Sequence, residues 1–188
     1  MSSGERKTTI RSRGRLPHWE QDYAAYFVTF RLFDSLPKTV LEKLIAEPAT
    51  DSGGPTLAKR LEQYLDSGGG ACYLMNSRIA DVLAETIRKF DSERYRLFAW
   101  CIMPNHVHVV VQPMHDFQLQ NILHSWKSYS SQMANRILGR KGSFWQREYY
   151  DHLLRDGELA RAISYTAENP AKAGLLNWKW VYVSKNWT

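Results

Sequence analysis

The stretch from Cys101 to Val111 constrains this fold more than any other part of the chain. Its sequence, CIMPNHVHVVV, is rich in valine and isoleucine, and no charged residue interrupts it from Met103 onward. Such a run predicts a buried β-strand that is entered through a turn at Pro104–Asn105. Because side chains alternate along a strand, His106 and His108 share one face, and the valines that alternate with them can enter a core on the other.

The two histidines can be interpreted in two ways. Imidazoles on alternate residues of a strand start about 7 Å apart and can converge on one metal ion. Alternatively, both are ordinary core or surface residues of a strand. The apolar surroundings favour the metal site, because two buried imidazoles side by side need partners. Such a site lacks at least one further ligand, which the rest of the chain must supply.

Composition narrows the class of protein. The chain has 188 residues and a net charge of +6, with seven Trp and ten Tyr, which suits a polyanionic partner whose bases can stack. Cys72 and Cys101 are too few for a disulfide framework or a zinc ribbon, so we expect a reducing compartment. We find neither an apolar signal segment nor a run approaching the roughly 20 residues of a membrane span. We therefore expect a cytoplasmic protein.

Apolar periodicity predicts the order of the elements. The expected elements are a strand at 26–33, helices at about 38–46, 56–66 and 77–90, strands at 94–102 and 106–112, a helix at 117–138, a strand at 145–155 and a helix at 157–168. This order is the β-α-β-β-α-β ferredoxin-like plan of an α+β protein. It predicts an antiparallel sheet with helices on one face, plus a C-terminal helix.

The expected domain organisation has three parts. Residues 1–22 read as a basic, flexible N-terminal arm, residues 23–177 as the main domain, and residues 178–188 as a C-terminal tail. We expect Asn169–Pro170 to end the last helix, because the residue before proline resists the α conformation. The segment after Gly174 is expected to pack on the body in extended form.

The C-terminal helix offers groups that could complete a metal site. Tyr165 and Asn169 are four residues apart and so share a helical face. The amide oxygen of Asn169 is a plausible third ligand beside two imidazoles, and Glu168 is another candidate ligand or base. A phenol, with an ordinary pKa near ~10, is a poor nucleophile unless a cation or base assists it. From spacing alone, Tyr165 could equally be an ordinary residue of an amphipathic helix.

The strand expected at 145–155 supplies rivals for the nucleophile. Tyr149 shares a strand face with Asp151, and Tyr150 shares the other face with His152. His152 could be a third ligand or a base, or simply a histidine at a strand edge. The residues alone leave Tyr149, Tyr150 and Tyr165 all open as nucleophiles.

Several motifs together resemble a known family. The segment Met103–His108 resembles the His-hydrophobic-His motif of the HUH single-stranded DNA endonucleases. Further segments look like one branch of that superfamily, the REP-associated tyrosine transposases. These segments are Gly70–Leu74, Trp126–Tyr129, Ser143–His152 and Tyr165–Leu175. The resemblance spans roughly residues 15–177 in the same motif order, although only the histidine pair is diagnostic by itself.

The resemblance implies an activity and a set of site residues. Tyr165 becomes the nucleophile that attacks a DNA phosphodiester, forms a 5′-phosphotyrosine and frees a 3′-hydroxyl. His106, His108 and Asn169 become ligands of Mg²⁺ or Mn²⁺. Related transposases often carry glutamine at the last of these positions, and asparagine is shorter by one carbon. The implied substrate is a REP hairpin with a short 5′ guide sequence, held as structured single-stranded DNA.

Basic and aromatic residues are candidates for holding that DNA. The candidate DNA-binding residues are Arg11, Arg13, Arg15, Trp19, Lys127, Arg136, Arg140, Lys141 and Trp145. For the two tryptophans, packing in the core or under the arm is the alternative. We expect no membrane partner and favour a monomer, with a dimer as the alternative.

Two other function classes compete with a nicking and joining enzyme. A ferredoxin-like sheet with aromatic residues can be a module that binds a REP hairpin or RNA without cutting it, in which case both histidines are incidental. The aromatic signature usual in RNA-recognition domains is missing here, which counts against that reading. The other alternative is a metal hydrolase that uses an activated water.

Overall fold

The computed structural model describes residues 8–12, 17–21, 23–46 and 57–187. The elements are β1 (Thr8–Ser12), β2 (Pro17–Gln21), β3 (Tyr26–Arg31), α1 (Lys38–Ala46), α2 (Leu57–Asp66), the 3-10 turn η1 (Tyr73–Met75), α3 (Ser77–Arg88), β4 (Tyr95–Ile102), β5 (His106–Pro113), α4 (Leu119–Ile137), β6 (Tyr150–Leu153), α5 (Glu158–Lys172) and β7 (Val181–Val183). Five strands form the main sheet in the order β6-β3-β5-β4-β7, and every neighbouring pair is antiparallel.

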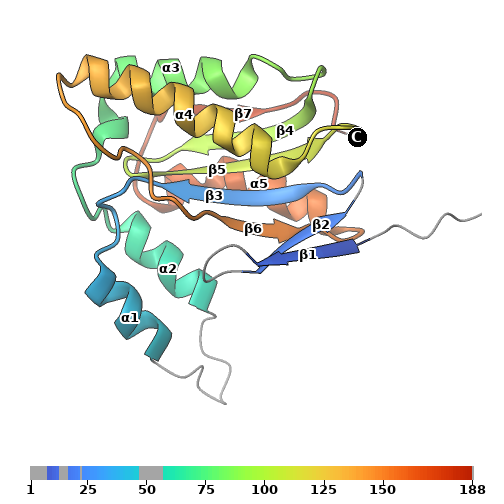
Figure 1. Cartoon of the computed structure of the whole chain (residues 1–188), viewed down its shortest axis with the longest axis horizontal. Coiled ribbons are helices and arrows are strands. Elements are labelled where there is room, and N and C mark those ends of the chain that lie inside the picture. Colours follow the sequence, from blue (N-terminus) through green and yellow to red (C-terminus); the bar gives the residue numbers. More distant parts are fainter. Residues whose placement is uncertain (1–7, 13–16, 22, 47–56, 188) are drawn as a thin grey trace, which may run out of the picture.

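Helices cover both faces of this sheet. Figure 1 shows α3 and α4 on one face and α5 on the other. The larger core lies on the first face, where Val107 and Val109 of β5 join a cluster that includes Leu83 of α3 and Trp126 of α4. A smaller cluster on the second face includes Val110 and Ile163 of α5. The predicted alternation of the valines, and the α+β ferredoxin-like fold with an added C-terminal helix, are confirmed.

The last helix runs further than the sequence indicated. Asn169–Pro170 was expected to end it, but α5 continues through Pro170 to Lys172. Proline lacks only its own N–H, so in the last turn it removes a single helical hydrogen bond. Burial of Thr166, Asn169 and Pro170 holds this end of the helix against the body. As a consequence, Asn169 stays in helical register one turn after Tyr165.

The strand expected at 145–155 is shorter in the structure. Only Tyr150–Leu153 forms β6, at the edge of the sheet beside β3. Trp145 makes an isolated bridge with Leu32, and its indole Nε1 donates to Ser130 Oγ at 2.9 Å. The Lys127 ammonium then binds the carbonyl oxygens of Gln146 and Arg147, at 2.7 and 2.8 Å. These two carbonyls are therefore satisfied by a side chain and not by a strand ladder.

The N-terminal region is not simply a flexible arm. β1 and β2 pair antiparallel, with Thr8 opposite Gln21 and Ser12 opposite Pro17. Arg11 lies in β1 and Trp19 in β2, whereas Arg13 and Arg15 fall outside the described residues. The tail agrees better with expectation, since β7 pairs with β4 in extended form and Trp180 is buried.

No helix in the described ranges has both the length and the apolar character that a membrane crossing requires. Both cysteines are free, and Cys101 is a buried core residue as expected.

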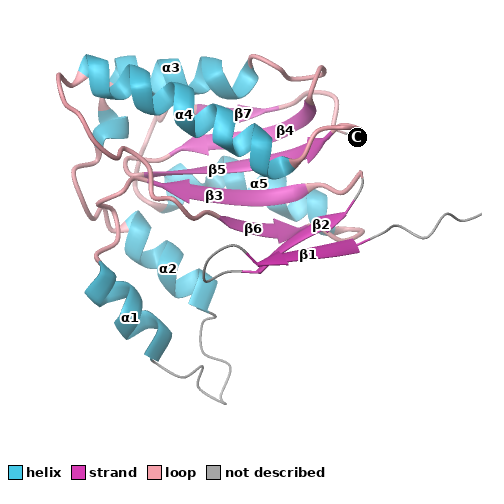
Figure 2. Cartoon of the chain, in the orientation of Figure 1, coloured by secondary structure: helices cyan, strands magenta, loops and turns pink. Residues whose placement is uncertain are grey.

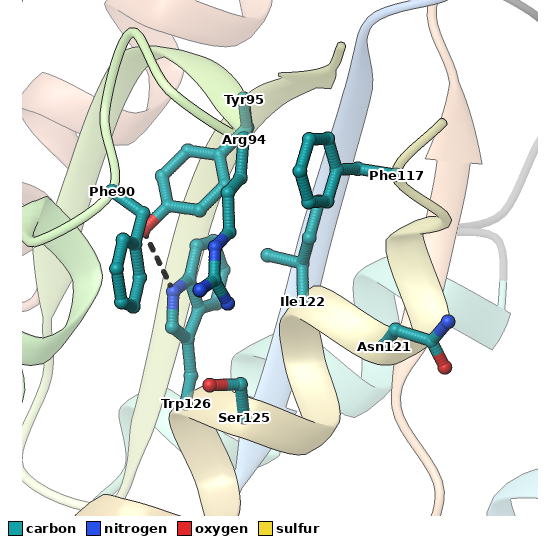
Figure 3. Close-up of a pocket in the computed structure, with 8 residues that line it drawn as sticks. All are labelled: Phe90, Arg94, Tyr95, Phe117, Asn121, Ile122, Ser125 and Trp126. Atoms are coloured by element: carbon teal, nitrogen blue, oxygen red, sulfur yellow. Dashed lines mark hydrogen bonds between the residues drawn. The ribbon is translucent and has the colours of Figure 1, made fainter. Parts of the chain in front are cut away.

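A small hollow on the α3/α4 face is part of the framework. It has a volume of about 50 Å³ and lies between α4 and the start of β4 (Figure 3). The Arg94 guanidinium lies 3.7 Å from the centre of the Phe90 ring. Deeper in, the Tyr95 hydroxyl accepts from Trp126 Nε1 at 3.0 Å and donates to the Ile87 carbonyl at 2.7 Å. This buried hydroxyl therefore ties β4 to both α3 and α4.

Replacing Tyr95 by phenylalanine should destabilise the protein by about 1–3 kcal/mol, because a buried donor and a buried carbonyl lose their partner. Urea denaturation measures this change in the free energy of unfolding. Tyr129, exposed on α4, is the control, since Tyr129→Phe should change stability by no more than about 0.5 kcal/mol. Equal stabilities of wild type and Tyr95→Phe would contradict a structural role for this hydroxyl.

Candidate metal and tyrosine site

The two histidines meet on the central strand of the sheet. β5 lies between β3 and β4, and His106 and His108 are 0% and 1% exposed. Their Nε2 atoms are 3.0 Å apart. The prediction that both side chains share one face is confirmed, and that face is the one α5 covers.

Asn105 fixes the protonation of His106. Its side-chain amide donates to the carbonyls of Leu65 and Gly69, at 3.0 and 2.8 Å, which orients its oxygen toward His106 Nδ1 at 2.7 Å. Since that oxygen can only accept, Nδ1 of His106 must carry the proton. The lone pair of His106 Nε2 therefore points at His108, into the shared space of the site.

His108 is held by β3 and lies beside α5. Thr29, opposite His108 in the β3–β5 register, places its hydroxyl 2.8 Å from His108 Nδ1. Phe27 stacks on the His108 ring at a centroid distance of 5.3 Å. Burial lowers the pKa of His108 to about 3, and burial together with His108 lowers that of His106 well below its usual value. Both imidazoles are thus kept neutral, as metal ligation requires.

α5 brings Tyr165 and Asn169 to this face. The Tyr165 ring packs edge-on against His108 and Phe27, at centroid distances of 6.0 and 5.6 Å. The Asn169 amide nitrogen donates to the Tyr165 hydroxyl at 3.2 Å. Asn169 is buried, and its Oδ1 has no hydrogen-bond partner. The structure therefore brings together the predicted residues of β5 and α5.

α2 contributes two carboxylates that the sequence analysis missed. Glu62 Oε1 lies 3.7 Å from His108 Nε2, and Asp66 Oδ1 lies 3.6 Å from His106 Nε2. Burial, and to a lesser degree the charge of Asp66, raises the pKa of Glu62 to about 7. Burial raises the pKa of Asp66 to about 6. The sequence did contain one indication of this pair. Glu62 and Asp66 are four residues apart on the helix, and each directly follows a leucine that can face a core.

A Glu62→Gln substitution should stabilise the metal-free protein increasingly as pH rises from about 5 to 8. Between the ordinary glutamate pKa of 4.5 and the folded value of about 7, the folded state binds more protons at Glu62 than the unfolded state does. Stability contributed by Glu62 is therefore lost as pH rises through this window. The lowered pKa values of His106 and His108 make stability increase with pH, but this effect is the same in the wild type and in Glu62→Gln. Urea denaturation in a chelator at several pH values measures the difference in the free energy of unfolding between Glu62→Gln and the wild type. A difference that does not change with pH would contradict the raised pKa of Glu62.

The remaining candidates for chemistry lie around a groove of about 640 Å³ that is also lined by His108 and Tyr165. Tyr150 and His152 line it from β6, and His152 Nε2 is 3.4 Å from Glu158. Figure 2 shows α2 below the sheet, near its β6 edge, and α5 behind the sheet. Glu168 instead forms an exposed ion pair with Lys172 at 2.8 Å.

The candidate DNA-binding residues are scattered. Trp145 is only 7% exposed and packs against Phe30, so it presents no free face to a base, and its predicted stacking role is wrong for this structure. Lys127 is engaged by backbone carbonyls, as described above. Arg136 and Lys141 are exposed. The Arg140 guanidinium lies 5.1 Å from the Tyr73 ring centre and donates to the Ser143 carbonyl.

The residues present fit a divalent cation. Two neutral imidazoles face each other, and two buried oxygens, Asn169 Oδ1 and Asp66 Oδ1, lack hydrogen-bond partners. Imidazole with amide and carboxylate oxygens is a donor set that suits Mn²⁺ and, through its oxygens, Mg²⁺. In the described part of the chain, no group of three or more His, Cys, Asp or Glu side chains is already drawn together for a metal. A third ligand beside the two imidazoles would have to come from Asn169 or, if α2 approached slightly, from Asp66.

Comparison with known proteins defines the class. The model of the family "Transposase IS200 like" matches residues 73–168, more than half of the chain. The chain therefore belongs to the IS200-like transposase family. The matched region contains His106, His108 and Tyr165 but stops one residue before Asn169.

Two relatives make the comparison more specific. The chain is 29% identical over 133 residues to a Haemophilus influenzae protein provisionally assigned as a REP-associated tyrosine transposase, covering 61% of this chain and 73% of that protein. Among solved structures it resembles a REP-associated tyrosine transposase bound to a REP hairpin, with a TM-score of 0.56 and 18% identity. That match covers 91% of this chain and 82% of the other. The resemblance inferred from the motifs is confirmed.

Proposed function

We propose that the chain is a metal-dependent endonuclease and strand transferase that nicks and rejoins REP-type hairpin DNA through a 5′-phosphotyrosine. One observation carries the proposal: the Tyr165 ring of α5 lies 6.0 Å from the buried His108 of the histidine pair. A nucleophile and a metal-binding pair on one face are what such chemistry needs.

Tyr165 acts as the nucleophile in this proposal. Its oxygen attacks the scissile phosphorus, the bond to the 3′-oxygen breaks, and the phenolic proton leaves while the 3′-oxygen gains one. Asn169, which donates to the Tyr165 hydroxyl, orients the phenol and stabilises charge that develops on it. Rejoining is the reverse reaction, in which a 3′-hydroxyl attacks the phosphotyrosine. The covalent bond conserves the energy of the phosphodiester, so no nucleotide cofactor is consumed.

His106, His108 and Asn169 are the proposed ligands of Mg²⁺ or Mn²⁺. When bound, the cation would act as a Lewis acid on the scissile phosphate. The chain keeps both imidazoles neutral by burial, and it fixes the His106 tautomer through Asn105. The ligand set is thus prepared before any cation or DNA arrives.

The DNA partner is proposed from charge, shape and the relatives. The net charge of +6 suits a phosphate backbone. The groove beside Tyr165 could receive unpaired nucleotides. The solved relative is bound to a REP hairpin, which supports the same class of substrate here. The proposed contacts are Arg11, Arg13, Arg15, Trp19, Lys127, Arg136, Arg140 and Lys141. We propose that the protein works as a monomer in the cytoplasm, on the nucleoid.

The test is a search for the covalent intermediate. The full chain is incubated with a single-stranded REP-type hairpin and Mn²⁺ or Mg²⁺, and the products are run on a denaturing gel. A metal-dependent band in which DNA is attached to protein supports the proposal. Cleavage without an adduct would point to a hydrolase that uses water, and binding without cleavage under either metal would point to a non-cleaving hairpin-binding or RNA-binding module.

A further inference from the structure

We propose that Asp66, at the end of α2, is an anionic ligand of the divalent cation, in addition to the groups that the histidine and tyrosine motifs supply. The proposal rests on the proposed function, because it concerns the same cation. It assigns a binding role to α2, which lies outside the residues that the family model matches.

The position of one carboxylate oxygen carries the inference. Asp66 Oδ1 is buried, makes no hydrogen bond, and lies 3.6 Å from His106 Nε2. Metal–ligand bonds near 2.1 Å in an octahedral site place adjacent donor atoms about 3 Å apart. The two histidine Nε2 atoms, 3.0 Å apart, have this spacing, and Asp66 Oδ1, 3.6 Å from His106 Nε2, would reach it by a small approach of α2. A buried, unpaired carboxylate oxygen is costly unless a cation compensates it.

Asn105 links this carboxylate to the histidine motif. The Asn105 amide donates to the carbonyls of Leu65 and Gly69, which flank Asp66 in the chain. The oxygen of the same amide receives the proton of His106 Nδ1. One buried side chain therefore fixes both the ring of His106 and the end of α2. Such an arrangement is expected if His106 and Asp66 bind the same ion.

Charge provides the chemical reason. The imidazoles are neutral and the Asn169 amide carries no charge, so these three groups alone leave a buried divalent cation uncompensated. Mg²⁺ and Mn²⁺ are hard cations that favour carboxylate oxygens. Glu62 is a second carboxyl group on the same helix, and its Oε1 lies 3.7 Å from His108 Nε2. Unlike Asp66, Glu62 has no buried oxygen that lacks a hydrogen-bond partner. Glu62 is therefore a matched control for non-specific electrostatic attraction.

The experiment measures Mn²⁺ binding to the full chain without DNA, by isothermal titration calorimetry and by the rise in melting temperature that Mn²⁺ causes. Asp66→Asn should weaken Mn²⁺ binding by roughly 10- to 100-fold or more, and Glu62→Gln should weaken it much less. Melting in a chelator tests whether each variant is folded, and His106→Ala gives the loss expected when a ligand of the proposed function is removed.

The outcomes separate the two proposals. Wild-type Mn²⁺ affinity in Asp66→Asn, with affinity lost in His106→Ala, would overturn the role of Asp66 and leave the proposed function intact. Equal losses in Asp66→Asn and Glu62→Gln would also overturn it, since they would indicate general attraction by charge. Absence of Mn²⁺ binding and of any Mn²⁺-induced rise in melting temperature in the wild type would contradict the metal dependence of the proposed function itself.

Discussion

Replacing Tyr165 by phenylalanine should abolish the covalent DNA adduct while leaving the fold and hairpin binding unchanged. The substitution removes only the hydroxyl that we propose attacks phosphorus, and the ring that contacts Phe27 and His108 is retained. Loss of a nucleophile that acts as part of a unit costs about 10³-fold or more in rate. The adduct is measured on a denaturing gel as a function of time, and hairpin binding is measured by a mobility shift.

Tyr150→Phe is the matched control, because Tyr150 lines the same groove from β6 and is the rival nucleophile. This variant should form the adduct at close to the wild-type rate. An adduct that persists in Tyr165→Phe and disappears in Tyr150→Phe would reassign the nucleophile to the edge strand.

Asn105→Ala should lower both stability and metal affinity. The substitution leaves the proton of His106 Nδ1 and the carbonyls of Leu65 and Gly69 without their partner. Each unsatisfied buried group costs about 1–3 kcal/mol, so we expect a total loss of roughly 3 kcal/mol or more in the free energy of unfolding. His106 then loses its fixed tautomer, and Mn²⁺ affinity should fall by about 10- to 100-fold. Urea denaturation and calorimetry measure the two effects.

Asn135→Ala is the control for losing an asparagine side chain. The amide nitrogen of Asn135 makes one hydrogen bond, to the Gly142 carbonyl, at a half-buried position on α4 far along the chain from the histidine pair. Its removal should cost about 1 kcal/mol and leave Mn²⁺ binding unchanged. Unchanged metal affinity in Asn105→Ala would show that the tautomer of His106 does not depend on this contact.

The histidine strand was predictable because its information is local. An apolar run with period-two alternation specifies a strand and the faces of its side chains, so the approach of His106 and His108 followed from the sequence. The helical spacing of Tyr165 and Asn169 was predictable for the same reason. The choice of Tyr165 over Tyr150 came from the family resemblance, since both tyrosines line the groove.

The errors arose where tertiary contacts override local pattern. Trp145 was a candidate for stacking on bases, but its indole fills the space beside Phe30 and donates to Ser130, so the alternative of packing in the core holds. Pro170 looks like a helix end, but its burial keeps α5 helical to Lys172. Glu62 and Asp66 read as the polar edge of an ordinary amphipathic helix. Their meeting with β5 depends on how α2 packs, which no local pattern specifies.

The histidines and Tyr165 lie on elements that are held in the fold to different degrees. The histidines sit on a strand hydrogen-bonded on both sides, whereas Tyr165 sits on a helix held mainly by the small apolar cluster around Ile163 and Val110. Opening a helix from such a cluster costs far less than deforming the centre of a sheet. If the proposed phosphotyrosine forms, a DNA end joined to Tyr165 would therefore travel with α5 while β5 stays fixed, and the two ends of a cut strand could part without unfolding of the protein.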